Sequence, residues 1–264
     1  ETDPEPAFEV QIKQGRAGEG TAWSCPHGVG RWMEDCGCST GAPPGWNQKW
    51  RSPLRRGLDG LRDGLGEIFD KEGPAILADP WKARDEYIEV IEGRSSADAA
   101  AFVRDRAAGD ISDSDIARGV SLLEAQRNAL LMFTSCGWFF NDISGIETAQ
   151  LMRYAARAVE LADGDEKDKL EQALLSELEK AASNIPALGT GADIYGRERI
   201  SASVSGDFLA GQFVLTRHLK CPGASPESFG YEFEVAEEDS TEFGGETVRT
   251  GLFTMVSPLS LIHI

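Results

Sequence analysis

The sequence predicts a mainly α-helical protein, in which a long ordered loop precedes a helical bundle domain and a truncated β-sheet region follows it. Three observations predict this class. Apolar residues recur at helical spacing through most of residues 53–220. Residues 23–50 are instead punctuated by Gly and Pro, yet hold four of the six Trp. Strict apolar–polar alternation, typical of a half-buried strand, appears after Pro222, in Tyr231–Val235.

These patterns divide the chain into successive parts. Residues 1–52 are predicted to hold one short strand, Phe8–Ile12, and the Trp/Cys/His-rich loop. Residues 53–220 form the helical domain, and residues 221–259 begin a β domain with a turn at Gly244-Gly245. Residues 260–264 continue no pattern and are interpreted as an artefactual tail. The linker-like first residues and the missing initial Met predict a fragment of a larger protein.

The first helix has the strongest pattern. Ser52 and Pro53 suit the N-cap and the first helical position. A stripe of apolar residues follows at spacings of three and four: Leu54, Leu58, Leu61, Leu65 and Ile68. Three glycines lie on a neighbouring face of the same helix: Gly57, Gly60 and Gly64. They predict the close approach of a ligand or of another backbone, and simple helix–helix contact is the alternative.

Further helices are predicted along the rest of the domain. One follows Asp79-Pro80 and carries Trp81, Ile88 and Ile91, and another spans residues 97–108. A third begins at Ser112 and points Ile116, Val120, Leu123 and Leu130 at the core. Residues 146–162 and 170–181 are predicted to pair as antiparallel neighbours because their connection is short. Residues 201–219 fit a helix or a strand, and a helix is favoured.

Composition excludes some classes of function. The net charge of −18 argues against binding a nucleic-acid backbone, which needs a basic surface. No apolar run is long enough to span a membrane, and no signal peptide is recognised. Five Cys, three of them within residues 25–38, do not form a disulfide framework. A cytoplasmic protein with reduced thiols is therefore expected.

The loop offers a metal site. Cys25 and His27 are two residues apart, and so are Cys36 and Cys38. In an extended backbone each pair points to one side, and two such pairs make a Cys3His set, which is a structural zinc combination. The alternatives are reduced thiols lining a pocket and, less favoured, a Cys25–His27 nucleophilic pair without an orienting residue.

The same loop offers a carbohydrate site. Indole rings stack on the apolar faces of sugars, and a few placed polar groups fix the hydroxyls. The candidate substrate-binding residues of the loop are Trp23, His27, Arg31, Trp32, Asp35, Trp46 and Trp50. A second candidate segment is Thr134–Asp142, with Trp138 between Cys136-Gly137 and two Phe. The alternative for both segments is that the aromatic residues pack the core.

Together these two segments resemble a known family. Trp23–Trp32, Asp35–Cys38, Gly45–Arg51 and the segment from Arg127 to Ala158 resemble domain of unknown function 3536. This domain follows the catalytic barrel in one branch of glycoside hydrolase family 57, the α-amylase/α-mannosidase-like group.

The resemblance implies a function for the parent enzyme. It implies retaining hydrolysis or transglycosylation of α-linked glucans by a Glu and an Asp on barrel strands. Both carboxylates would precede residue 1, so no catalytic residue is assigned in this chain. The implied partners are an α-glucan or oligosaccharide and the N-terminal barrel, with Trp138 at the family's Trp position. Family members tend to have an acidic residue beside that Trp, where this chain has Cys136-Gly137. The competing hypothesis is a non-catalytic zinc-stabilised or interaction module.

Overall fold

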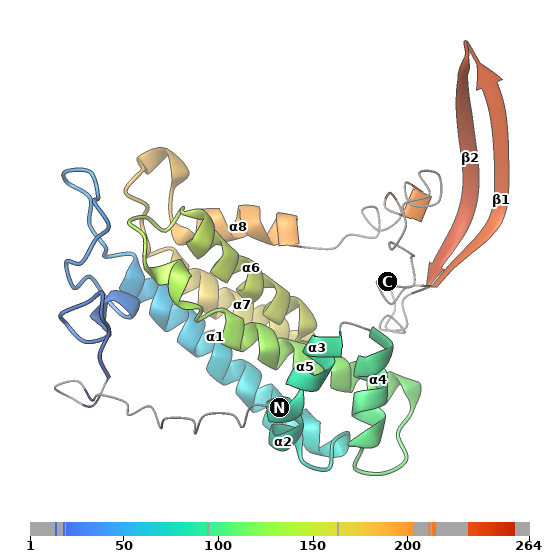
Figure 1. The fold of residues 1–264 in the computed structure, drawn as a ribbon, viewed down its shortest axis with the longest axis horizontal. Helices are drawn as coiled ribbons and strands as arrows, with labels where there is room; N and C mark the ends of the chain where they lie inside the picture. Colours follow the sequence, from blue (N-terminus) through green and yellow to red (C-terminus); the bar gives the residue numbers. More distant parts are fainter. Residues whose placement is uncertain are drawn as a thin grey trace, which may run out of the picture.

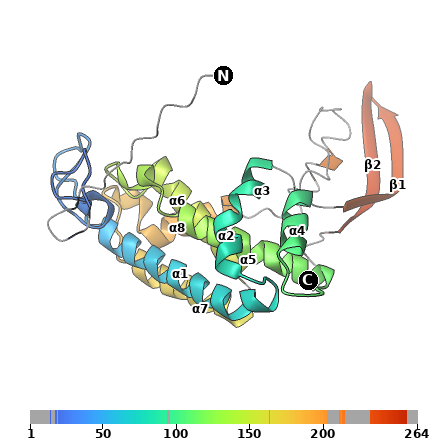
Figure 2. The same ribbon diagram turned by 60° about the horizontal axis from the view of Figure 1, so that its bottom comes forward.

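A computed structural model describes residues 20–93, 96–162, 164–202 and 232–256, together with residues 14, 18, 211, 213 and 214. The described part is mainly helical, which confirms the predicted fold class (Figure 1). The bundle comprises α1 (Arg51–Glu72), α5 (Asp113–Leu131), α6 (Ile146–Leu161), α7 (Gly164–Leu178) and α8 (Gly191–Ala202). The shorter helices α2 (Pro80–Glu86), α3 (Ile88–Gly93) and α4 (Ser96–Asp105) lie at one end of it. The loop of residues 20–50 lies at the opposite end (Figure 2).

Helix α1 runs the length of the bundle with its predicted stripe facing the core. Leu54, Leu58, Leu61 and Leu65 are each at most 2% exposed. The helix begins at Arg51, one residue before the predicted N-cap Ser52, and its N-cap Trp50 makes no side-chain capping bond. The predicted N-cap, Ser52, was therefore wrong by two residues, because Trp50 takes this position. No hydroxyl caps this end of the helix. Instead, Trp50 is buried, with 1% of its surface exposed, and this packing holds the start of the helix in position.

The glycines of α1 mark a helix–helix contact. A Cβ on Gly64 would lie 2.2 Å from Leu170 Cδ2, and one on Gly57 would lie 3.0 Å from Leu174 Cδ1. Gly60 has open space beside it. Leu170 and Leu174 belong to α7, so α7 packs along α1 (Figure 2). Helix α7 also contacts α6, as predicted, but its main partner is α1, because the glycines of α1 let α7 approach closely.

The remaining helices differ from the predictions mainly at their ends. Asp79 caps α2 by accepting from the Lys82 N–H, but the predicted single helix breaks at Tyr87 into α2 and α3. Ser112 starts α5 with a capping box, as predicted. Leu130 is 56% exposed rather than buried, because it lies where α5 ends. Most of residues 201–219 lies outside the described part of the chain.

The sheet is a single antiparallel hairpin of β1 (Glu232–Phe243) and β2 (Glu246–Val256). The predicted turn residues Gly244 and Gly245 both have positive φ, at 60° and 84°. The hairpin stands apart from the bundle (Figure 1). The predicted strand Phe8–Ile12 and residues 260–264 lie outside the described residues. Among the helices that are described, none has both the length and the apolar character needed to cross a bilayer.

Candidate metal centre and aromatic pocket

Four potential metal ligands converge in the loop. The sulfur atoms of Cys25, Cys36 and Cys38 and a ring nitrogen of His27 all lie within 4.8 Å of one another. Cys25 Sγ is 3.7 Å from Cys36 Sγ and 3.8 Å from Cys38 Sγ. Cys38 Sγ is 3.5 Å from His27 Nδ1. The structure thus brings the two predicted pairs together, and the cluster could hold a metal ion.

Tight backbone turns bring the ligands together. Gly28 and Gly37 follow His27 and Cys36 with φ of 72° and 79°, a region that side chains disfavour. Gly30 opens the short 3-10 helix η1 (Gly30–Trp32), and a Cβ on it would lie 3.1 Å from Cys36 Cβ. The glycines of this loop therefore have a specific role, which is to let the second ligand pair fold onto the first.

The thiols differ in acidity. Burial raises the pKa of Cys25, but hydrogen bonds from the backbone N–H groups of Arg31 and His27 and from neighbouring thiols lower it to about 7 overall. Burial, together with the adjacent sulfur atoms, raises the pKa of Cys36 to about 11. A metal ion would displace the remaining protons, since thiolates are the ligand form. The ring nitrogen of His27 contacts Cys38, which does not favour a Cys25–His27 nucleophilic pair.

Hydrogen bonds join the loop to the second candidate segment, residues 134–142. Arg51 donates from Nη1 to the Cys38 carbonyl and from Nη2 to the Phe140 carbonyl, each at 3.2 Å. Trp32 Nε1 donates to the Ser135 carbonyl at 3.1 Å. Thr40 donates to Asn141 Oδ1 from its N–H at 2.8 Å and from its hydroxyl at 3.0 Å. The two segments that stand out in the sequence therefore form one structural unit.

Asp142 anchors this unit to the bundle. Its carboxylate is 6% exposed and accepts hydrogen bonds from the Ser144 N–H at 2.9 Å and the Ser183 hydroxyl at 2.8 Å. The N–H of Asn184 donates to it at 2.6 Å, and the side chain of Asn184 accepts from the Asn47 N–H at 2.9 Å. Burial raises the pKa of Asp142, but the hydrogen bonds outweigh this effect and hold the pKa below its usual value.

Replacing Asp142 with asparagine is expected to cost about 2 kcal/mol of unfolding free energy at pH 7, because hydrogen bonds to a charged acceptor are lost. A depressed pKa stabilises the fold above the unfolded pKa of about 3.9, and that stability is lost as pH falls through the folded pKa. The difference in melting temperature between wild type and Asp142→Asn should therefore shrink from pH 6 to pH 3. A difference that stays constant over this range would contradict the assignment.

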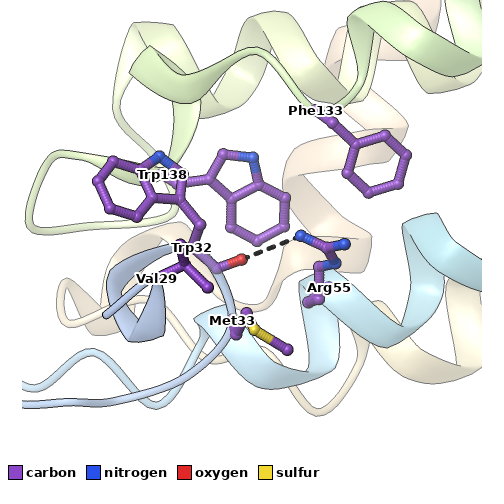
Figure 3. Close-up of a pocket in the computed structure, with 6 residues that line it drawn as sticks. All are labelled: Val29, Trp32, Met33, Arg55, Phe133 and Trp138. Atoms are coloured by element: carbon purple, nitrogen blue, oxygen red, sulfur yellow. Dashed lines mark hydrogen bonds between the residues drawn. The ribbon is translucent and has the colours of Figure 1, made fainter. Parts of the chain in front are cut away.

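A cavity of about 460 Å³ opens between the loop and the bundle (Figure 3). Its lining comes from the loop, α1, the end of α5 and the 3-10 helix η3 (Ser135–Trp138): Val29, Trp32, Met33, Arg55, Phe133 and Trp138. Arg55 is the charged member, and Asp59 pairs with its Nε at 2.9 Å. Its guanidinium lies 4.8 Å from the Phe133 ring centre and donates to the Trp32 carbonyl at 3.4 Å. The cavity therefore combines aromatic walls with one charge-balanced polar group.

The protein-family model for a domain of unknown function (DUF3536) matches residues 46–261, which is most of the chain. The chain belongs to the DUF3536 family. Neither curated proteins nor solved structures show a significant match to it. The matched segment includes the cavity residues Arg55, Phe133 and Trp138, whereas the four-ligand cluster lies before it.

The predicted substrate-binding residues of this DUF3536 chain separate in space. Trp32 and Trp138 line the cavity together. Trp23 is 95% exposed, with its ring 6.4 Å from that of Phe139. The half-buried Trp46 and the exposed His27 and Asp35 lie outside the cavity lining.

Two predicted residues are enclosed in the protein. Trp50 is 1% exposed, and its indole N–H donates to Gln48 Oε1 at 3.0 Å. Arg31 is 4% exposed and lies over the Phe139 ring at 4.3 Å. Direct substrate contact by these two residues does not fit the structure, because the packing that orders the loop uses their side chains.

In this DUF3536 chain, the residue before Trp138 must be small because it packs against α6. A Cβ on Gly137 would lie 2.3 Å from Leu151 Cδ1 and Cγ in α6. The Gly137 carbonyl also accepts from the Thr148 hydroxyl at 2.6 Å. Gly137 thus allows η3 to pack against α6 and holds Trp138 at the cavity floor. Any larger residue beside this Trp would require a different spacing between η3 and α6.

Sequence reasoning missed four cavity residues: Val29, Met33, Arg55 and Phe133. Val29 and Met33 flank η1, within the segment that carries the ligands. Arg55 lies one turn after Arg51 in α1, and Phe133 immediately precedes the second candidate segment. Their closeness in sequence to the two motifs was the only indication that these four residues line a site. The sequence alone does not show that the loop folds across α1.

Proposed function

We propose that Cys25, His27, Cys36 and Cys38 bind one structural Zn²⁺ ion. Zinc binds thiolate sulfur at about 2.3 Å and imidazole nitrogen at about 2.0 Å in tetrahedral geometry. That geometry requires sulfur atoms about 3.8 Å apart and a sulfur–nitrogen separation of about 3.6 Å. The separations of 3.7 and 3.8 Å between sulfurs, and of 3.5 Å between Cys38 Sγ and His27 Nδ1, match these values. This match is the observation that carries the proposal.

The proposed zinc ion has a structural role. Four protein ligands fill a tetrahedral shell and leave no open position for a substrate or an activated water. Val29, Trp32 and Met33 lie in the sequence between the ligands His27 and Cys36. The metal would therefore close the loop that supplies one wall of the cavity. Elemental analysis of the purified protein should give about one zinc per chain, and a metal-free preparation that keeps the same melting temperature would contradict this role.

We propose further that the cavity is a carbohydrate subsite of a glycoside hydrolase family 57-like enzyme acting on α-linked glucans. Two features support this. Trp32, Phe133 and Trp138 offer ring surface to the apolar face of a sugar. Arg55 is paired with Asp59, which favours a neutral, hydroxyl-bearing ligand over an anionic one. In this proposal catalysis belongs to carboxylates outside this chain, and either hydrolysis or transglycosylation is compatible.

Calorimetric titration of the full-length protein with maltoheptaose tests the carbohydrate proposal. Trp32→Ala is expected to weaken binding about tenfold, because loss of one stacked ring costs about 1.4 kcal/mol. Trp23→Ala is the matched control, since its indole is exposed and lies outside the cavity lining. Equal affinity of wild type and Trp32→Ala, or absence of binding by both, would contradict the proposal. If the protein contains zinc but does not bind maltoheptaose, the alternative of a non-catalytic, metal-stabilised interaction module would be favoured.

A further inference from the structure

Two arginines beside the four-ligand cluster are buried without an acidic partner. Arg31 is 4% exposed and Arg51 is 0% exposed, and neither forms an ion pair within the described part of the chain. The Nε atom of each is buried with no hydrogen-bond partner. Their other nitrogens donate to main-chain carbonyls, of Phe139 for Arg31 and of Cys38 and Phe140 for Arg51. A buried charge that is only partly paired is costly.

Aromatic rings near these arginines do not remove that cost. Arg31 lies 4.3 Å from the Phe139 ring centre, and Arg51 lies 5.3 Å from the Trp50 ring centre. Cation–π attraction of this kind is smaller than the penalty for burying an unpaired guanidinium. Another negative group is therefore needed close to both side chains.

The start of α1 adds positive potential at the same place. Arg51 is the first residue of α1, where the helix dipole is positive and favours an acidic side chain. The first turn of α1 contains no acidic residue, and no side chain caps it. The positive charge of Arg51 is therefore unfavourable at this end of the helix. A negative group close to Arg51 would offset both this effect and the cost of burial.

The cysteine residues lie close to both arginines. The Arg31 N–H is hydrogen-bonded to Cys25, and Arg51 donates to the Cys38 carbonyl. Burial and the charge of Arg31 lower the pKa of Arg51, whereas the charges of Cys36, Asp35 and Cys38 oppose this shift. A Zn²⁺ ion with three thiolates and a neutral imidazole carries one net negative charge. The metal-bound cluster therefore places a full negative charge beside the two arginines, in addition to the exposed carboxylate of Asp35.

We infer that Arg31 and Arg51 are positioning residues that stabilise the zinc–thiolate centre by balancing its negative charge. This inference rests on the proposed zinc site. The guanidinium groups place two positive charges beside the cluster and fix the loop against residues 139–140 through the carbonyl bonds. In return, the bound centre compensates the burial of both arginines.

Competitive zinc titration against a chromogenic chelator, on the full chain, tests this inference. Arg51→Gln removes the charge and is expected to weaken zinc binding about tenfold or more, as for other groups that surround a metal site. Arg51→Lys keeps the charge and should weaken zinc binding less than Arg51→Gln does, although Lys cannot reproduce both carbonyl bonds. The matched control is Arg118→Gln, because Arg118 is also partly buried with an unbonded Nη2 but pairs with Glu72, away from the loop. Its zinc affinity should equal that of wild type.

The outcomes separate this inference from the zinc proposal. No zinc binding by the wild type would overturn the zinc site itself. Zinc binding by the wild type with unchanged affinity in Arg51→Gln would overturn only the charge role, as would equal weakening in Arg51→Gln and Arg51→Lys. If Arg51→Gln fails to fold, Arg31→Gln and Arg31→Lys repeat the comparison. With Co²⁺ in the site, the sulfur-to-metal charge-transfer band of the Gln variants should move to lower energy while the tetrahedral ligand-field bands persist.

Discussion

Cys36→Ser is expected to lose zinc and to melt at a lower temperature than the wild type. Cys36 is one of the four proposed ligands, 3.7 Å from Cys25 Sγ and beside Gly30. Loss of a group that only surrounds a metal site weakens binding by about 10- to 100-fold, so loss of a direct ligand should weaken it at least about a hundredfold. At free zinc near 100 times the wild-type Kd, a hundredfold loss of affinity corresponds to about 2.3 kcal/mol of stability, and complete loss of binding to about 2.7 kcal/mol.

A matched variant makes this result specific. Cys136→Ser removes a thiol that is exposed and lies outside the four-ligand cluster. It should keep about one zinc per chain and the wild-type melting temperature. Elemental analysis and calorimetric unfolding at a fixed, buffered zinc concentration measure both effects. If Cys36→Ser retains as much zinc as Cys136→Ser, the four residues are not the ligands.

Trp138→Ala is expected to have the largest effect on stability of any single change in the cavity. Trp138 is 1% exposed and packs between the loop and α6, so truncation would leave a large void. Replacing a buried Trp by Ala typically costs about 3–5 kcal/mol. Urea unfolding monitored by circular dichroism measures this loss. Trp23→Ala should change stability by at most about 0.5 kcal/mol, because the Trp23 ring is exposed.

The same burial limits what Trp138→Ala says about ligands. A fall in activity of this variant could come from disruption of the packing around the cavity rather than from a lost ligand contact. Trp32 is half-buried, so its truncation has less effect on the core. Glucan affinity should therefore be judged from Trp32→Ala. A Trp138→Ala variant as stable as Trp23→Ala would contradict the position of Trp138 in the cavity floor.

Local patterns predicted the helices well because each depends on a few adjacent residues. The stripe of α1, the capping box at Ser112 and the Gly244-Gly245 turn all follow from near neighbours. Packing partners depend on residues far apart in the chain. The pairing of α7 with α1 depends on Leu170 and Leu174 lying against the glycines of α1, and neither helix indicates its partner by itself.

The candidate site was predicted in part for the same reason. The spacing of the Cys and His pairs indicated a four-ligand cluster, and the two Trp-containing motifs indicated a common site. Spacing does not show which aromatic residues are enclosed. Trp50 and Arg31 serve the packing of the loop, while Arg55 reaches the cavity from a helix in which only the glycines had suggested a ligand.

X-ray absorption at the zinc edge measures how the proposed ion is coordinated. We expect three sulfurs at about 2.3 Å and one nitrogen at about 2.0 Å from zinc in the protein as purified. In Cys36→Ser the sulfur count should fall or the metal should be absent. A wild-type shell made only of oxygen and nitrogen, or a purified protein without zinc, would contradict the account.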